Sequence, residues 1–463
     1  MMAAKRPKVL FVGRSTGHFS YFESVIAGLM RRGAEVEMLL DEGWSKAWPW
    51  GVDKSAIAEF VAAHGDFPHD WLLRRIDKHR DRIFGLRELR SYRSYLVRKE
   101  TTPYYIKRWQ GYLTPEWKAK SEGALFRALL KTPLAGAALK LAEDRTPPDE
   151  GIVALLKAKA PDVMLICPMN MRYSEEVDYA KAAMALGIPV AVTVISWDNL
   201  STKGLIHVTP DRTFVWNRYQ YEDAIQIQKL PKAKVTISGA PFFDKWFDKT
   251  SDLSSREAFC KEVGFNPARR ILLYLGSSKN IAKDESWFVK TLKKQFAKSK
   301  NPTLKGYQIL VRPHPAHATV YKDLDEEGLK VWPAGGALPE TREAFTAMRN
   351  SFFHADAVIG INTSGMIDAV LADKPTFSVR LPLYEQTQSN SKHFKYLEDA
   401  DALYLLDDVA ELLPALKDVQ AGKDPKAGQR RAFAELFARP AGLDRPAGDV
   451  VAEGVLAMAK ARG

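Results

Sequence analysis

The chain has 463 residues, more than the roughly 250–300 that one hydrophobic core usually serves, so we expect two domains. Hydrophobic residues make up 46% and charged residues 27%, a composition that excludes disordered, collagen-like and coiled-coil proteins. Two cysteines, Cys167 and Cys260, are too few for a disulfide framework or a thiolate metal cluster. The sequence has no signal-peptide core and no stretch near the roughly 18 apolar residues of a membrane span. We therefore expect a cytoplasmic protein that is soluble or lies peripherally on the inner face of the cell membrane.

Strands and helices alternate in the first part of the chain. Residues 8–13 (KVLFVG) predict a strand, residues 21–32 a helix that ends at Gly33, and residues 35–40 a second strand. This order is typical of a parallel sheet with crossover helices. After residue 150 the predicted elements are helices at 152–159 and 175–186 and strands at 162–166, 189–195, 212–215 and 234–237.

A second series of the same kind follows residues 239–241. Its predicted strands are 271–275, 307–311, 357–360 and 376–379, and its helices are 285–296, 342–355 and 364–371. We expect an α/β protein with two doubly wound, Rossmann-like domains facing each other across a cleft. The N-terminal domain covers 1–238 with a helical insertion at about 45–150, the second domain covers 239–430, and 431–463 is a C-terminal helical segment.

The net charge of +12 is concentrated in residues 72–120, which hold fourteen Lys and Arg against five acids. Apolar residues recur there at helical spacing, and aromatic residues follow them. One hypothesis is a surface that docks on anionic lipid or on an anionic acceptor. The alternative is a solvated, Arg-rich helical insertion whose aromatic side chains pack inward. No recognition motif supports binding to nucleic acid.

Ligands of open α/β sheets bind at the carboxyl ends of strands, so the loops there are the candidate sites. In residues 13–20 (GRSTGHFS), Gly13 and Gly17 permit close approach of a substrate, and His18 can take a proton near neutral pH. The alternative is a plain strand-to-helix turn with a surface histidine. The spacing is not that of a dinucleotide fingerprint.

The loop at 196–204 (SWDNLSTKG) crowds polar and aromatic side chains after a predicted buried strand. Sugar sites combine an aromatic face with amide and carboxylate groups, which makes Trp197, Asp198 and Asn199 candidates. A turn capped by Asp198 or Asn199 is the alternative.

Phosphate-binding candidates follow strands of the second series. Ser277 and Ser278 offer hydroxyls and amides after residues 271–275. In VRPHPAH, Arg312 suits a bidentate phosphate contact and His314 a phosphate or leaving-group oxygen. We do not expect a metal at His314 and His317, because no nearby ligand completes a first shell.

The last candidate loop, 360–375 (GINTSGMIDAVLADKP), ends a predicted strand at a helix start. Thr363, Ser364 and Gly365 lie where free N–H groups and the helix dipole favour an anion. Asp368 lies one turn further on, where it can reach a ribose diol. The alternative is an N-cap alone.

Taken together, these loops resemble GT-B glycosyltransferases, a wider group that includes non-hydrolysing nucleotide-sugar 2-epimerases and glycerophosphotransferases of surface polymers. The opening VLFVGRSTGHFSYFESVIAGLMRRGAEVEML is similar to their acceptor domains and implies that His18 lies in the acceptor cleft. VTISGAPFFD resembles the G-x-P-x-x-D segment that enters the nucleotide domain. RPHP and GINTSGMIDAVLADKP resemble later strands, where Ser-Gly holds diphosphate and the acid before Ala holds ribose. Residues 45–150 are unmatched.

Three departures narrow this resemblance. Gly360 stands where retaining enzymes of the E-x7-E group have their first acid. The acidic and Arg-rich loops of the epimerases are not visible. The D-x-D triplets at 323–325 and 399–401 lie in polar stretches and predict no metal site.

The resemblance implies an inverting, metal-independent glycosyltransferase that uses a nucleoside diphosphate sugar, for which we expect UDP, as co-substrate and no other cofactor. We expect His18 first and Asp198 second as base, with Gly17, Trp197 and Asn199 at a glycan or lipid-linked acceptor of surface polysaccharide or glycolipid assembly. Ser277, Ser278, Arg312, His314, Thr363, Ser364, Gly365 and Asp368 are expected to bind the donor. The rival hypotheses are a 2-epimerase, a glycerophosphotransferase, and a non-catalytic GT-B scaffold on a membrane surface.

Overall fold

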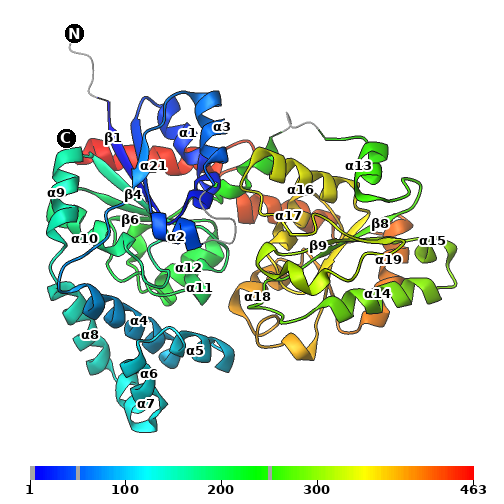
Figure 1. Ribbon diagram of the computed structural model, residues 1–463, viewed down its shortest axis with the longest axis horizontal. Coiled ribbons are helices and arrows are strands. Elements are labelled where there is room, and N and C mark those ends of the chain that lie inside the picture. Colours follow the sequence, from blue (N-terminus) through cyan, green and yellow to red (C-terminus); the bar gives the residue numbers. More distant parts are fainter. Residues whose placement is uncertain (1–5, 48–52, 249–252, 463) are drawn as a thin grey trace. The chain divides into compact units, whose positions relative to one another are not determined.

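The computed structural model describes residues 6–47, 53–248 and 253–462, and the chain forms two compact units (Figure 1). The N-terminal unit comprises Met1–Asp244 and Leu436–Gly463, and the C-terminal unit comprises Lys245–Glu435. The expected divisions after residues 238 and 430 differ from these by a few residues. The expected C-terminal helical segment is part of the N-terminal unit.

The N-terminal unit contains a parallel sheet with strand order β3-β2-β1-β4-β5-β6-β7. Its central strands, such as VMLIC in β4, are buried along their whole length, as expected of a sheet covered on both faces. The strands are β1 (Lys8–Gly13), β2 (Glu35–Leu40), β3 (His69–Trp71), β4 (Val163–Cys167), β5 (Val190–Thr193), β6 (Arg212–Val215) and β7 (Val235–Ile237). All were predicted except β3, a short strand inside the range assigned to the insertion.

Helices complete the Rossmann-like layers of this unit. They are α1 (Glu23–Arg31), α2 (Glu42–Ala47), α3 (Ser55–His64), α9 (Glu150–Lys159), α10 (Glu176–Ala185), α11 (Asn199–Thr202), α12 (Arg218–Gln226) and α21 (Ala447–Arg462). Figure 1 shows the red α21 beside the blue α1, and the two helices pack together. Asp244 fixes the start of α21, because its carboxylate accepts hydrogen bonds from the backbone N–H groups of Ala447 and Gly448 at 2.9 and 2.8 Å.

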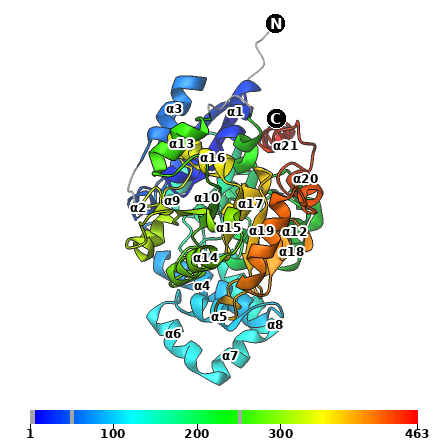
Figure 2. The same ribbon diagram turned by 90° about the vertical axis from the view of Figure 1, so that its right-hand side faces the viewer.

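The inserted helices form a group of their own beside this sheet, as Figures 1 and 2 both show. They are α4 (Arg80–Val97), α5 (Pro103–Gln110), α6 (Pro115–Glu122), α7 (Ala124–Lys131) and α8 (Pro133–Arg145). The aromatic side chains of the basic segment pack inward: Tyr95 stacks on Trp109 at 5.4 Å, and both are buried. We call α4–α8 the helical insertion.

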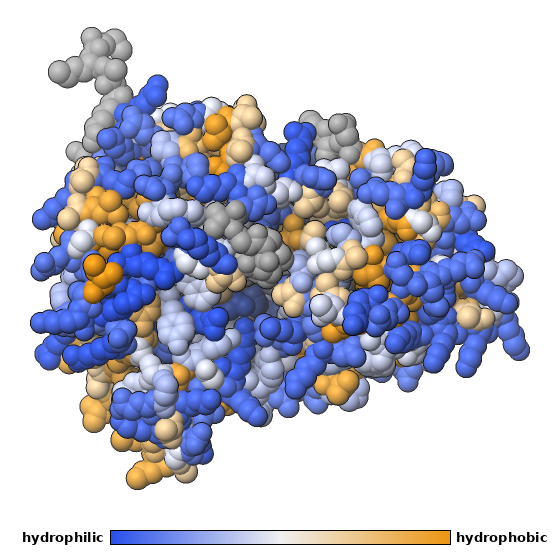
Figure 3. Space-filling view, viewed as in Figure 1, coloured by the Kyte–Doolittle hydropathy of each residue, from blue (hydrophilic) through white to orange (hydrophobic). Residues whose placement is uncertain are grey.

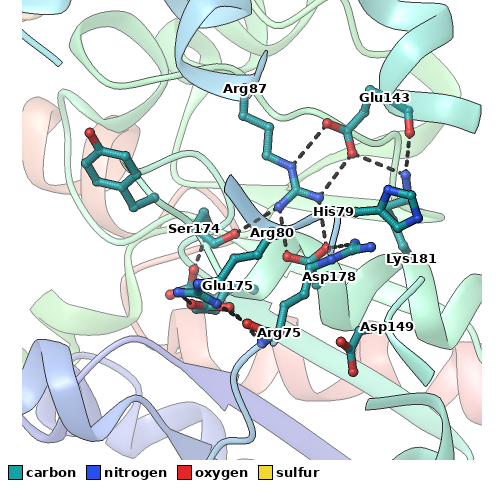
Figure 4. Close-up of polar contacts among 12 residues, drawn as sticks. Arg75, His79, Arg80, Arg87, Glu143, Asp149, Ser174, Glu175, Asp178 and Lys181 are labelled. Carbon is teal, nitrogen blue, oxygen red and sulfur yellow. Dashed lines mark hydrogen bonds and ion pairs between the residues drawn. The ribbon is translucent and has the colours of Figure 1, made fainter. Parts of the chain in front are cut away.

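Ion pairs hold the helical insertion to the sheet domain. Arg87 of α4 is buried between Glu143 of α8 and Asp178 of α10, with Nε–Oε2 and Nη1–Oδ2 distances of 3.1 and 2.8 Å (Figure 4). Arg75 also binds Asp178, at 2.9 Å. Several arginines of the basic segment are therefore neutralised inside the unit, which contradicts the idea that the whole segment is one exposed cationic surface.

The C-terminal unit contains a parallel sheet with strand order β10-β9-β8-β11-β12-β13. Its strands are β8 (Ile271–Leu275), β9 (Gln308–Arg312), β10 (Leu329–Val331), β11 (Ala357–Gly360), β12 (Thr376–Val379) and β13 (Tyr404–Leu406). Its helices are α13 (Arg256–Val263), α14 (Ser286–Lys298), α15 (Pro302–Lys305), α16 (Arg342–His354), α17 (Gly365–Leu371), α18 (Lys392–Asp399), α19 (Leu412–Gln420) and α20 (Ala427–Phe433). The expectation of two doubly wound α/β domains is confirmed.

Candidate functional sites

The carboxyl edge of the C-terminal sheet brings the predicted donor loops together. Leu275 of β8 is in register with Arg312 of β9 on one side and with Gly360 of β11 on the other. Because all three strands are parallel, the loops that follow them leave the sheet side by side. The predicted donor residues after β8, β9 and β11 thus lie at one edge, as the sequence order alone could not show.

Arg312 is a buried cation at this edge. Its guanidinium is buried, donates a 3.0 Å hydrogen bond from Nη1 to Ser351 Oγ, and lies 5.6 Å from the ring of Trp332. Burial lowers the pKa of Arg312 to about 10, and the negative charge of Asp368 opposes that shift. The side chain is therefore a fixed positive charge at neutral pH, suited to a phosphate oxygen.

Asp368 is held by the segment that enters the C-terminal unit. Its Oδ1 accepts a 2.6 Å hydrogen bond from Nε1 of Trp246. Burial raises the pKa of Asp368 to about 6, while Trp246, Lys245 and Arg312 act in the opposite direction. The sequence analysis did not select Lys245 and Trp246, although the aromatic run FFDKWF directly after G-A-P could have indicated them.

The loop after β8 is built around buried polar groups. Ser277 is fully buried, its N–H donates to Glu285, and its Oγ has no hydrogen-bond partner among the described residues. Ser278 is partly exposed, and its carbonyl accepts from Ile281 at 2.9 Å. His317 lies against the same loop, with Nε2 2.8 Å from the carbonyl oxygen of Lys283. The hydroxyl of Ser277 is therefore enclosed in this loop beside Glu285.

The ring of His314 makes a hydrogen bond within its own turn. Its Nδ1 accepts a 3.2 Å hydrogen bond from the backbone N–H of Ala316. Burial lowers the pKa of His314 to about 4, and His317 adds to the effect. The ring is thus neutral at pH 7 and offers a phosphate no positive charge.

The predicted anion site at the start of α17 is weaker than the sequence indicated. Thr363 and Gly365 are partly exposed and Ser364 is exposed. The N–H of Gly365 points to Thr363 Oγ1 at 3.4 Å, while those of Met366 and Ile367 bond to the carbonyls of Thr363 and Ser364 at 3.1 and 2.9 Å. Few N–H groups remain for an anion.

At the carboxyl edge of the N-terminal sheet, His18 follows β1 in the short helix η1 (Thr16–Tyr21), next to the partly exposed Gly17. Its Nδ1 is buried without a hydrogen-bond partner among the described residues. Burial lowers the pKa of His18 to about 3, with the charge of Arg14 adding to the effect. The imidazole is neutral at pH 7 but is a much weaker base than the sequence led us to expect.

Sequence reasoning missed a buried charged cluster at the same edge. It consists of Arg14 after β1, Asp41 after β2, Glu88 of α4 and Glu176 of α10, all almost fully buried. Arg14 lies 3.6 Å from Glu176 and stacks over the ring of Trp44 at 4.0 Å. Each of the three acids has an oxygen with no hydrogen-bond partner within the described part of the chain.

Glu88 stands out in this cluster. Its Oε1 accepts a 2.8 Å hydrogen bond from the backbone N–H of Tyr173, and its Oε2 is one of those oxygens. Burial raises the pKa of Glu88 to about 7, although Arg14 and Arg172 oppose the shift. A carboxyl group that titrates near neutral pH can act as a general base. Only tertiary contact could reveal it, because α4 lies in the unmatched segment.

The SWDN loop is internally bonded. Asp198 accepts hydrogen bonds from Ser196 at 2.6 Å and Thr202 at 2.7 Å and pairs with Lys203 at 3.0 Å. The Nδ2 of Asn199 donates a 2.9 Å hydrogen bond to Oδ1 of Asn170, and Trp197 is buried. Asp198 stands at the N-cap of α11 but its side chain makes no capping hydrogen bond, so these contacts tie the loop together without forming the cap that was the alternative.

Comparisons with known proteins come from structure alone, because no family model and no curated protein matches the sequence. The chain is similar to UDP-GlcNAc 2-epimerase from Neisseria meningitidis bound to UDP-GlcNAc, at 11% identity and a TM-score of 0.56 over 97% of this chain and 100% of that one. It is also similar to a glycosyltransferase from Rickettsia africae, at 9% identity and 0.53 over 99% of each chain. Arabidopsis thaliana UGT89C1 complexed with UDP matches at 12% identity and 0.50 over 98% of this chain and 100% of that one. The chain therefore has the two-domain GT-B fold, as the sequence motifs predicted.

The described residues contain neither a metal site nor a membrane-spanning helix. Between residues 6 and 462, outside 48–52 and 249–252, no group of three His, Cys, Asp or Glu is placed to hold a metal ion. Over the same residues, no helix combines the length and apolarity needed to cross a membrane.

Proposed function

We propose that this protein is a glycosyltransferase that moves a sugar from a nucleoside diphosphate sugar to an acceptor hydroxyl with inversion. The observation that carries the proposal is the meeting of Arg312, Ser277 and Asp368 at the carboxyl edge of the C-terminal sheet. A fixed guanidinium suits a diphosphate, and a buried carboxylate suits the hydroxyls of a ribose. Similar folds bound to UDP and UDP-GlcNAc support this choice of donor class.

In the proposed reaction an acceptor oxygen attacks the anomeric carbon as the bond to the diphosphate breaks. Arg312 stabilises the negative charge that develops on the diphosphate, with help from Ser277 and Ser278. The acceptor proton passes to a base. His18 and Asp198 were expected in that role, and we add Glu88, since its free oxygen and pKa near 7 suit the role better.

The cluster of Arg14, Asp41, Glu88 and Glu176 is our candidate for acceptor binding. Carboxylate oxygens without protein partners can accept hydrogen bonds from sugar hydroxyls, and Trp44 supplies an aromatic face. An acceptor in surface polysaccharide or glycolipid assembly, either a glycan or a lipid-linked sugar, fits these groups.

A thermal-shift screen with UDP, GDP, CDP, CMP and ADP tests the donor site, because a ligand of the native state raises the melting temperature. We expect one diphosphate to give a shift that Arg312→Ala abolishes. Arg270→Ala is the matched control, since Arg270 precedes β8 at the opposite edge and pairs with Asp356 at 2.7 Å. The donor assignment fails if no nucleotide binds, or if both variants bind like the wild type.

A nucleotide-sugar 2-epimerase is the second candidate, because an epimerase is among the similar folds. Product analysis separates the two functions. An epimerase converts the nucleotide sugar when no acceptor is present. The proposed transferase releases the free nucleoside diphosphate only when an acceptor is added, together with a glycosylated product of inverted anomeric configuration.

A further inference from the structure

The helical insertion exposes an apolar face on α7 and α8. Leu125 and Leu129 of α7 are 84% and 62% exposed, and Leu134 and Leu141 of α8 are 80% and 47% exposed. Leu134, Ala138 and Leu141 follow one another at helical spacing, so they form a stripe along one side of α8. Figure 3 shows hydrophobic side chains at the end of this subdomain, interspersed with hydrophilic ones. Single exposed leucines are common, but a set of neighbours marks an interaction surface.

A small hollow lies at the end of this stripe. Its volume is about 300 Å³, and its lining includes His79, Arg82, Ala138, Leu141 and Arg145. Apolar side chains of α8 form part of its wall, while the arginines come from the start of α4 and the end of α8. The hollow therefore combines an apolar wall with positive charge.

These two arginines differ from their neighbours in the insertion. Arg75, Arg80 and Arg87 are each paired with a carboxylate at 2.5–3.1 Å. Arg82 and Arg145 are exposed, and within the described chain neither has an ion-pair or hydrogen-bond partner for its guanidinium. Lys118 and Lys131 are further exposed cations on α6 and α7. The face is thus apolar and cationic, without acids that neutralise Arg82 or Arg145.

We propose that this face of α7 and α8 docks on an anionic phospholipid bilayer. The four leucines enter the boundary between headgroups and acyl chains, and a lipid phosphate is held in the hollow by Arg82 and Arg145. A bilayer suits the observations because an interfacial helix needs exposed apolar side chains flanked by cations. The buried ion pairs of Arg87 hold the insertion rigidly, so the face is preformed.

This inference deepens the proposed function, since a lipid-linked acceptor would be reached at that surface. It also relocates the sequence-based hypothesis of a membrane dock. The aromatic residues of 104–117 pack inward or against one another, and the exposed apolar residues belong to α7 and α8.

The test is flotation of the full chain with vesicles of phosphatidylcholine alone or mixed with phosphatidylglycerol. We expect binding to the mixed vesicles only, weakened by salt. The double variants Leu125→Ser/Leu129→Ser and Arg82→Gln/Arg145→Gln should each reduce partitioning by roughly 10- to 30-fold. Leu383→Ser and Arg269→Gln, exposed positions of the C-terminal unit, are matched controls and should bind like the wild type.

Three outcomes overturn the dock: no binding to the mixed vesicles, equal binding to both vesicle types, or binding that neither double variant reduces. If the leucine variant instead dissociates a soluble oligomer seen by light scattering, the face is a protein interface. The rise in melting temperature that a nucleotide causes, measured without vesicles, tests the proposed function separately. The dock variants should leave this rise unchanged. If the wild-type protein shows the nucleotide shift but does not bind the mixed vesicles, only the dock is refuted.

Discussion

The indole Nε1 of Trp246 donates a 2.6 Å hydrogen bond to Oδ1 of Asp368. This bond links the segment that enters the C-terminal unit to the helix that follows β11. It fixes the orientation of a carboxylate whose environment, through burial, would otherwise favour the neutral form. The orientation of this carboxylate is therefore set by a contact within the C-terminal unit.

Replacing Trp246 should weaken nucleotide binding if Asp368 holds the ribose. Trp246→Phe keeps the aromatic packing but removes the N–H, and we expect the affinity for the donor nucleotide to fall about tenfold. Isothermal titration calorimetry measures the change. Trp287→Phe is the control, because Trp287 lies in the same unit and donates a comparable 3.1 Å bond to Tyr384. Equal nucleotide affinities for the wild type and Trp246→Phe would contradict a role for Asp368 in binding the nucleotide.

Asp368 should make stability depend on pH. Its folded pKa of about 6 lies above the ordinary value of 3.8 for an aspartate, so the folded protein binds the proton more tightly than the unfolded chain. The favourable contribution is complete below about pH 4 and is lost as the pH rises towards 6, by up to about 3 kcal/mol. Asp368→Asn lacks this titration, so its melting temperature should rise relative to that of the wild type between pH 4 and 6. A constant difference would refute the raised pKa.

The pH dependence of turnover distinguishes the candidate bases. If Glu88 takes the acceptor proton, kcat/KM rises with pH and levels off above about pH 7, because the ionised form is the active one. Glu88→Gln should then lower kcat at least about 100-fold, while the exposed control Glu122→Gln has no effect. If His18 is the base, its pKa of about 3 predicts a flat profile from pH 5 to 8 and loss of activity in His18→Asn.

Asp178 should be important for the stability of the helical insertion. Although burial favours its neutral form, the charge of Arg87 keeps the pKa of Asp178 below its ordinary value. Asp178→Asn leaves Arg75 and Arg87 with too little negative charge in a buried site and should cost about 3 kcal/mol. Hydrogen exchange of α4, α8 and α10 measures the loss. The exposed pair of Lys140 and Asp144 gives the control, since Asp144→Asn should cost less than about 0.5 kcal/mol.

The sequence by itself determined the two parallel sheets, because fully buried strands are runs of apolar residues with turn signals at their ends. KVLFVG and ILLYL coincide with β1 and β8 as predicted. It also indicated Ser277, Arg312 and Asp368 as candidate ligand-binding residues, since ligand-binding loops follow such strands directly. The short strands β3, β10 and β13 were not predicted; each has three residues and at most one that is fully buried, so none reads as an apolar run.

The tertiary structure decided which charges are available and which are paired. Arg87 appeared in the sequence as part of a cationic patch, but its partners Glu143 and Asp178 lie 56 and 91 residues further along the chain. The same holds for Glu88, whose burial beside Arg14 comes from folding α4 against the edge of the sheet. Charge pairing and burial depend on contacts between distant segments, and these contacts set the pKa of a side chain. Residue spacing therefore indicated candidate ligand-binding loops, and only the folded chain showed which of their side chains have unpaired atoms.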